Sequence, residues 1–150
     1  MLFHFELLSN GRIILILMQF CLQKIPNGWP KEVLSDIENL TEEKIDEVLN
    51  QFLKDFKEGS VVENKGWPIN NMSTYIISKV ALSAYTRVAA KKYPSICINA
   101  VCPGFVKTDI NYNTGYLTPD EGAESIVRLT LLPDNSPSGH FFVRNEEKPF

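Results

Sequence analysis

The sequence predicts an α/β protein built on a small parallel sheet of about three strands, with helices on its faces. Two apolar runs rich in β-branched residues and a third, glycine-led run have the composition of buried strands. Stretches with helical periodicity separate these runs. The expected strands are 12–18, 95–101 and 139–143, and the helices between the later ones are 73–92 and 118–131. This alternation of strand and helix favours parallel pairing with right-handed crossovers.

The N-terminal part of the sequence predicts the end of a helix, a turn and then one strand. Residues 1–8 are mostly apolar and are typical of the end of a helix, which the turn signal at 9–11 would stop. Residues 12–18 follow as a β-branched, aliphatic run without alternation, as expected for a strand covered on both faces.

A helical insertion is expected at about 28–70, between the first strand and the long helix. A short helix is predicted over 31–39, and a second begins after the N-cap Thr41 and stops near Gly59. The second helix carries one apolar stripe at helical spacing. Its members are Ile45, Val48, Leu49, Phe52, Leu53 and Phe56.

The C-terminal part carries the clearest local signals. A helix is predicted over 73–92, and a long connection with few regular signals covers 103–115. Thr118 and Glu121 have the spacing of a capping box, with Pro119 at the first helical position. We therefore expect a helix from here to about residue 131, followed by the last strand and a polar tail.

Composition excludes several function classes. The 150 residues carry a formal net charge of −3, and their basic residues are dispersed, which argues against nucleic-acid binding. Three cysteines, an odd number without CxxC spacing, are typical of a reducing, cytoplasmic setting. His4 and His140 have no metal-ligand spacing. The apolar run 13–18 is too short to span a bilayer. A signal-peptide interpretation of this run stays open, although no small-residue cleavage pattern follows it.

Tyr75 and Lys79 form the strongest chemical motif. Their separation of four residues places them one turn apart on one face of the predicted helix. A phenol has an ordinary pKa of about 10 and is a poor proton donor or acceptor near neutral pH. A neighbouring ammonium would favour the phenolate and bring that pKa toward working pH.

Several motifs together resemble the short-chain dehydrogenase/reductase family. They are the YxxSK motif on a long helix, the strand after it, the PGxVxTD motif at 103–109, the capping-box helix and the glycine-led strand. The resemblance covers about residues 7–143 and implies the C-terminal half of a Rossmann-like domain. The insertion at 28–70 resembles the monomeric carbonyl-reductase branch, with salutaridine- and menthone-reductase-like enzymes.

This resemblance implies roles for matching residues. Tyr75 would protonate a carbonyl oxygen during hydride transfer, and Lys79 would lower the phenol pKa and bind the nicotinamide ribose. The nicotinamide side of an NADP cofactor would be lined by Pro103, Gly104, Val106 and Thr108. The substrate would be a small carbonyl compound, and the insertion would cover the surface used elsewhere for dimerisation, which implies a monomer.

Two features depart from the family pattern. No two of the eight glycines are close enough to build the glycine-rich turn that binds a cofactor pyrophosphate. Residues 15–21 contain no serine or threonine to hold the substrate carbonyl; Gln19 is either a substitute donor or a surface polar residue. An inactive fragment or interaction module is therefore the alternative to a carbonyl reductase. Its first strand would leave an exposed edge prone to self-association.

Overall fold

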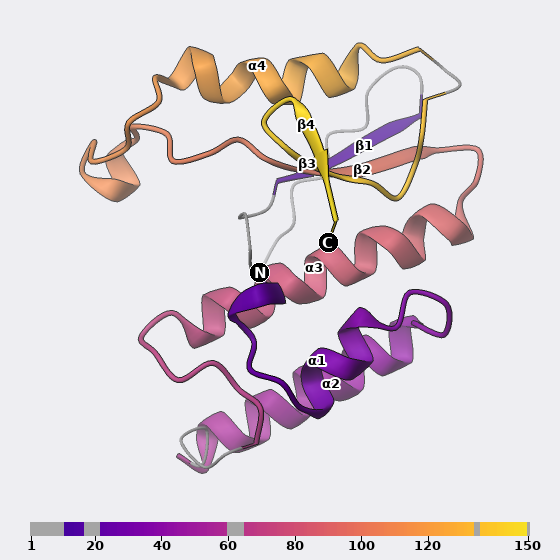
Figure 1. The fold of residues 1–150 in the computed structure, drawn as a ribbon, viewed down its shortest axis with the longest axis vertical. Helices are drawn as coiled ribbons and strands as arrows, with labels where there is room; N and C mark the ends of the chain where they lie inside the picture. The colour runs from indigo at the N-terminus through magenta and orange to yellow at the C-terminus, as the bar shows by residue number, and fades with distance from the viewer. Residues whose placement is uncertain (1–10, 17–21, 60–64, 134–135, 150) are drawn as a thin grey trace. The chain divides into compact units, whose positions relative to one another are not determined.

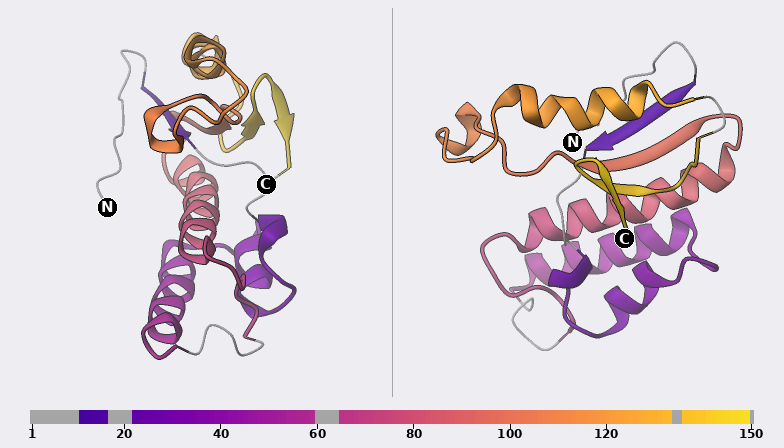
Figure 2. Two further views of the ribbon diagram at one scale, coloured as in Figure 1. Left: turned by 90° about the vertical axis from the view of Figure 1, so that its left-hand side faces the viewer. Right: turned by 45° about the horizontal axis from the view of Figure 1, so that its top comes forward.

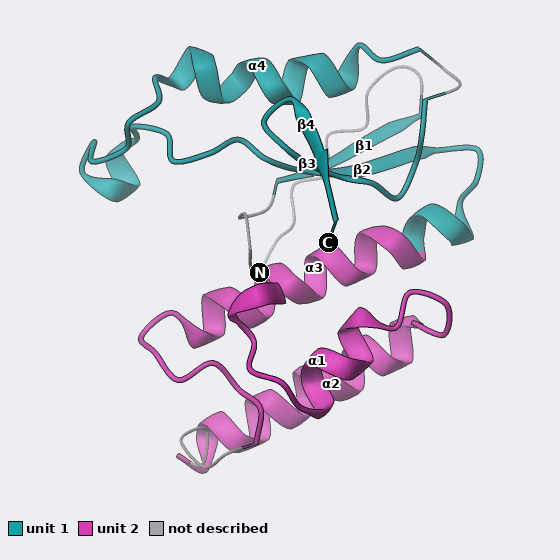
Figure 3. Cartoon of the chain, in the orientation of Figure 1, with its two compact units in different colours: residues 1–19, 89–149 teal, residues 20–88, 150 magenta. Residues whose placement is uncertain are grey.

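The computed structural model describes residues 11–16, 22–59, 65–133 and 136–149 (Figure 1). The chain divides into two compact units, one made of residues 1–19 and 89–149 and the other mainly of residues 20–88 (Figure 3). The helix end expected at 1–8 and the last two residues of the first predicted strand lie outside the described residues.

The first unit contains a four-stranded sheet in the order β1-β2-β3-β4. The strands are β1 (Arg12–Ile16), β2 (Cys97–Cys102), β3 (Phe141–Val143) and β4 (Glu146–Lys148). The pairs β1–β2 and β2–β3 are parallel, with Leu15 opposite Ala100 and Ala100 opposite Phe141. These three strands confirm the predicted parallel sheet.

The fourth strand was missed, because the sequence predicts only a polar tail after residue 143. β4 pairs antiparallel with β3 after a two-residue turn, in which Arg144 has a positive φ of 54°. All three residues of β4 are exposed, so the strand has no apolar alternation that a sequence pattern could detect. The side chains of His140 and Glu147 also meet, with Nδ1 and Oε1 2.7 Å apart.

Helix α4 (Pro119–Thr130) covers one face of this sheet, as Figure 2 shows. The apolar core of this unit includes Val101 from β2, Leu129 from α4 and Phe142 from β3. The predicted capping box is confirmed: Thr118 Oγ1 accepts from the Glu121 amide at 3.2 Å, and Glu121 Oε2 accepts from the Thr118 amide at 2.7 Å. This backbone hydrogen bond lowers the pKa of the Glu121 carboxyl.

The second unit is helical. It contains the short 3₁₀ turn η1 (Leu22–Lys24), α1 (Trp29–Ser35), α2 (Glu42–Lys57) and most of α3 (Ser73–Lys92). The bounds of α3 agree with the prediction. Helix α1 ends at Ser35, earlier than the predicted residue 39, because the Asp36 carboxylate accepts from both the backbone and the side-chain amide of Asn39. Such local side-chain bonds compete with helix propagation.

The apolar stripe of α2 is only partly buried. Ile45, Val48 and Phe52 are buried, whereas Leu53 and Phe56 are about half exposed, at 49% and 52%. The buried face instead continues through a carboxylate, that of Asp55. The stripe therefore predicts the correct face of the helix but not its last turn.

Side chains of the described residues Gln51, Lys65 and Trp67 donate to Asp55 and stabilise it in this position. Its Oδ2 accepts from the Trp67 indole at 2.8 Å, and its Oδ1 accepts from Gln51 and from Lys65, each at 3.0 Å. The indole hydrogen bond is the largest cause of a lowered pKa at this carboxyl, followed by the bond from Lys65.

This lowered pKa predicts an acid-sensitive contribution to stability. Since the folded pKa lies below the ordinary value of 3.8, the contribution is complete above that value and is lost as pH falls through the folded pKa. We expect Asp55→Asn to be less stable than wild type at neutral pH but to lose less stability between about pH 5 and pH 2. Urea denaturation at several pH values measures this. The exposed Asp46→Asn on the same helix is the control, and an equal acid slope in wild type and Asp55→Asn would contradict the prediction.

Candidate active site

Tyr75 and Lys79 lie together on α3, as their spacing predicts. The Lys79 ammonium nitrogen is 5.7 Å from the centroid of the Tyr75 ring. The Tyr75 side chain is 42% exposed and Lys79 is half-buried, so the pair lies on an accessible face of the second unit. Between them, the Ser78 hydroxyl donates to the Tyr75 carbonyl at 2.8 Å. Ser78 therefore bonds back onto its own helix.

The loop after β2 carries the other predicted residues and is closed by backbone hydrogen bonds. The Lys107 amide donates to the Leu117 carbonyl at 2.8 Å, and the Leu117 amide donates to the Phe105 carbonyl at 3.1 Å. Gly104 has a φ of +92°, and a Cβ there would lie 2.6 Å from Leu117 Cδ1. Glycine suits this position because the backbone angle is strained for any other residue, and a Cβ would also require the Leu117 side chain to shift.

Val106 is held at the centre of this loop by contacts that the sequence did not reveal. A Cβ on Gly115 would meet its backbone, and a Cβ on Gly122 would meet its side chain. The Asn111 side chain donates to the Val106 carbonyl at 2.7 Å and accepts from the Thr108 amide at 3.1 Å. The Thr-x-x-Asn spacing of 108–111 is that of a capping box, and it is a sequence signal that could have indicated these contacts.

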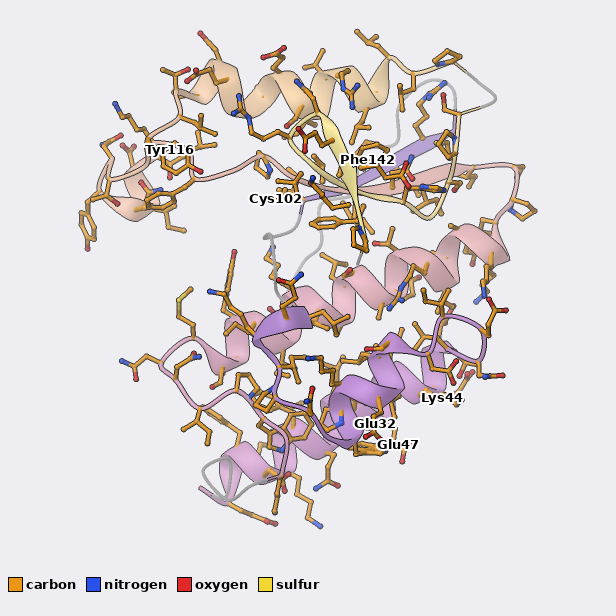
Figure 4. The ribbon with its side chains drawn as sticks, in the orientation of Figure 1. Glu32, Lys44, Glu47, Cys102, Tyr116 and Phe142 are labelled. Atoms are coloured by element: carbon orange, nitrogen blue, oxygen red, sulfur yellow. The ribbon has the colours of Figure 1, made fainter. Side chains whose placement is uncertain are left out.

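The same loop presents apolar side chains to solvent. Phe105 and Tyr116 pack edge-to-face with their centroids 6.1 Å apart, and Tyr116 extends from the loop in Figure 4. Ile110 and Tyr112 are almost fully exposed, at 91% and 90%. The loop therefore combines a rigid backbone with an accessible apolar surface.

The predicted site residues fall into two groups that the structure defines separately. Tyr75 and Lys79 belong to the second unit, whereas Pro103, Gly104, Val106 and Thr108 belong to the first. Gln19 lies outside the described residues. Within the described ranges, no three or more His, Cys, Asp or Glu side chains gather as metal ligands, and no helix has the length and apolarity to cross a membrane.

The two hydrogen bonds that the Asn111 side chain makes to Val106 and Thr108 predict a contribution to stability. Asn111→Ala removes both hydrogen bonds to the loop, so we expect the free energy of unfolding to fall by about 1–2 kcal/mol. Urea denaturation gives this value, and faster exchange of the Thr108 amide would locate the change. The exposed Asn50→Ala on α2 is the control and should change stability little. Equal stability of wild type and Asn111→Ala would show that the link contributes nothing.

Known proteins resemble this chain over most of its length. A family model described as enoyl-(acyl carrier protein) reductase matches residues 58–133. Short-chain dehydrogenase/reductase 1 of Saponaria officinalis is 60% identical over 129 residues, which are 86% of this chain and 42% of that protein. Carbonyl reductase [NADPH] 1 of Homo sapiens is 36% identical over 109 residues, covering 69% of this chain and 38% of that protein.

A solved structure, that of salutaridine reductase from Papaver somniferum, matches with a TM-score of 0.82 and 47% identity. The match covers 90% of this chain and 46% of that one. The chain thus spans less than half the length of these relatives.

The parallel strands and the helix that covers them define a Rossmann-like α/β protein. The chain belongs to the short-chain dehydrogenase/reductase family and corresponds to the C-terminal half of its members in the salutaridine-reductase branch.

Proposed function

We propose that this chain supplies the proton donor and the nicotinamide-side loop of an NADPH-dependent carbonyl reductase that acts on small ketones or aldehydes. The observation that carries the proposal is the 5.7 Å separation between the Lys79 ammonium and the ring of an accessible Tyr75. The family supports a reductase, and the name of the human relative supports NADPH over NADH.

In this function Tyr75 donates a proton to the substrate carbonyl oxygen. Lys79 assists because a nearby positive charge favours the phenolate, and so lowers the cost of giving up the phenolic proton. The exposed position of the ring suits this role, since a proton donor must come within hydrogen-bond reach of the substrate. Lys79 would also donate to the ribose of the bound cofactor.

The loop of the first unit fits the nicotinamide end of such a cofactor. When bound, NADPH supplies the hydride. The Val106 amide makes no hydrogen bond within the described part of the chain, so this donor is available for a carboxamide oxygen. Gly104 leaves the loop without a side chain at its first turn, and Pro103 and Thr108 border the same segment. We propose these four residues as the nicotinamide-side contacts.

A non-catalytic protein of the same lineage is the second candidate. Residues 15–21 hold no serine or threonine for the substrate carbonyl, which favours this candidate. The 150 residues by themselves also hold no cluster of glycines for a cofactor pyrophosphate. Each tenfold loss of dinucleotide affinity corresponds to about 1.4 kcal/mol of lost binding energy. The chain alone is therefore expected to bind NADPH weakly.

A paired activity assay separates the two candidates. The chain is tested alone and joined to the part of the Saponaria officinalis relative that precedes the matched segment, with NADPH and a cyclic ketone. We expect the joined protein to oxidise NADPH in a ketone-dependent way and the chain alone to be at least about 100-fold slower. A joined protein that is folded, monodisperse and binds NADPH, yet reduces no ketone, would favour the non-catalytic candidate.

We also propose that the protein is a cytoplasmic monomer. The dispersed charge and the odd number of cysteines without CxxC spacing support the location, and the helical insertion supports the monomer. Among the described strands β1 and β4 are the two outer ones, so self-association through a strand edge would use one of them. Light scattering at several concentrations measures the mass; a concentration-independent dimer would contradict the monomer.

A further inference from the structure

The second unit contains a buried carboxylate that no role assigned above accounts for. The Asp55 side chain is only 2% exposed, and among the described residues its two oxygens accept hydrogen bonds from Gln51, Lys65 and Trp67. Burial of a carboxylate is costly unless it is paired and hydrogen-bonded. Here the donors come from the helix itself and from the segment that follows it, so the carboxylate ties the two together.

Trp67 is the main partner in this arrangement. Its ring is 2% exposed and contacts Phe52 of α2 edge-to-face at 5.2 Å between centroids, and Trp29 of α1 at 6.4 Å. Beside it, Gly66 packs so tightly on Pro30 that a Cβ would lie 3.0 Å from the proline Cδ. The segment 65–68 is therefore held by the hydrogen bond from the Trp67 indole nitrogen to Asp55 and by aromatic packing around the Trp67 ring.

This segment leads directly into the helix that carries Tyr75. Pro68 is buried, and two residues later Asn70 organises the helix start. The Asn70 side chain accepts from the Met72 amide at 2.8 Å, and its carbonyl accepts from the Ser73 amide at 3.1 Å. Tyr75 is the third residue of α3, and its side chain is 42% exposed. Its place thus depends on where the helix begins.

We propose that Asp55 is a positioning residue for Tyr75: it holds the Trp67 indole and so fixes the start of α3 and the place of the phenol. The consequence for catalysis rests on the proposed function. The structural part does not, because it concerns only α2, the segment 65–72 and the first turn of α3.

Amide hydrogen exchange on the 150-residue chain tests the structural part. Trp67→Phe keeps an aromatic ring and removes the indole donor, whereas Asp55→Ala removes the acceptor. In both variants we expect the Met72, Ser73 and Ile76 amides to exchange about 10- to 100-fold faster, because a hydrogen bond to a charged group is lost. Amides in the later part of α3, 84–88, are the internal control and should change less than about threefold.

Asp55→Asn provides the conservative rescue. Its carbonyl oxygen still accepts from the indole, so exchange at the three amides should stay closer to wild type than in Asp55→Ala. A second readout is the ¹³Cζ signal of Tyr75, assigned with Tyr75→Phe, which should shift or broaden in Trp67→Phe and in Asp55→Ala but much less in Asp55→Asn.

Two results would overturn the proposal. One is unchanged exchange at Met72, Ser73 and Ile76 in folded variants. The other is uniform acceleration along the whole of α3, which would mean that Asp55 contributes only to global stability. Neither readout requires ketone reduction. A joined protein that reduces no ketone would therefore count against the proposed function only. Hydrogen exchange would still decide whether Asp55 positions Tyr75.

Discussion

Replacing Tyr75 by phenylalanine should lower ketone reduction by the joined protein about 100- to 10,000-fold while leaving NADPH affinity within a few-fold of wild type. The substitution removes one hydroxyl and keeps a ring that is already 42% exposed, so little packing is lost. General acid catalysis accounts for a rate effect of this size. The expected signature is therefore a loss in kcat with a similar KM for ketone.

Tyr85→Phe provides a matched control for this experiment. Tyr85 lies on the same helix and undergoes the same chemical change, but it is ten residues from Tyr75 and six from Lys79. Its variant should retain wild-type turnover. A Tyr75→Phe protein that reduces ketone at the wild-type rate would exclude the phenol as proton donor.

Lys79→Met extends the same experiment to the second member of the pair. Methionine keeps an unbranched side chain and removes the charge, so the Tyr75 phenol should titrate at a higher pH than in wild type. Titration followed by the Tyr75 ¹³Cζ signal measures this change. An unchanged titration curve would show that the 5.7 Å neighbour does not act on the phenol.

The second large effect is expected at Trp67. Trp67→Ala should lower the free energy of unfolding by about 3–5 kcal/mol, because it leaves a cavity where a fully buried ring contacted Phe52 and Trp29. It also removes the donor to the Asp55 carboxylate, which leaves a buried charge with fewer partners. Urea denaturation followed by far-UV circular dichroism measures the loss.

Trp29→Ala is the control for ring size. Trp29 is 39% exposed, so the same truncation should cost much less than at Trp67. Equal losses at the two positions would show that the contacts of Trp67 with Asp55 and Phe52 do not determine the stability of this unit.

The elements that the sequence predicted well are those with local causes. Helix α3 and the capping box at the start of α4 follow from residues within one or two turns of each other. The three parallel strands also follow, since an apolar strand run is recognisable from its own composition. The pairing of Tyr75 with Lys79 needs only helical geometry, and it is confirmed.

The elements that were missed depend on partners far along the chain. β4 is a row of exposed charged residues that becomes a strand only because β3 offers backbone partners. The sequence predicts no role for Gly115 or Gly122, yet a Cβ at either position would collide with Val106. The hydrogen bond from Trp67 to Asp55 crosses twelve residues, and no periodicity indicates it.

The sequence by itself therefore determined the family, the order of the three parallel strands and the helices between them, and the helix face that carries the tyrosine–lysine pair. Each of these follows from local patterns or motif spacing. Only the tertiary structure decided what surrounds Val106 and which donors satisfy the buried Asp55. The physical reason is that close packing and the burial of a charge are settled between segments that meet in space, and no single stretch of chain carries that information.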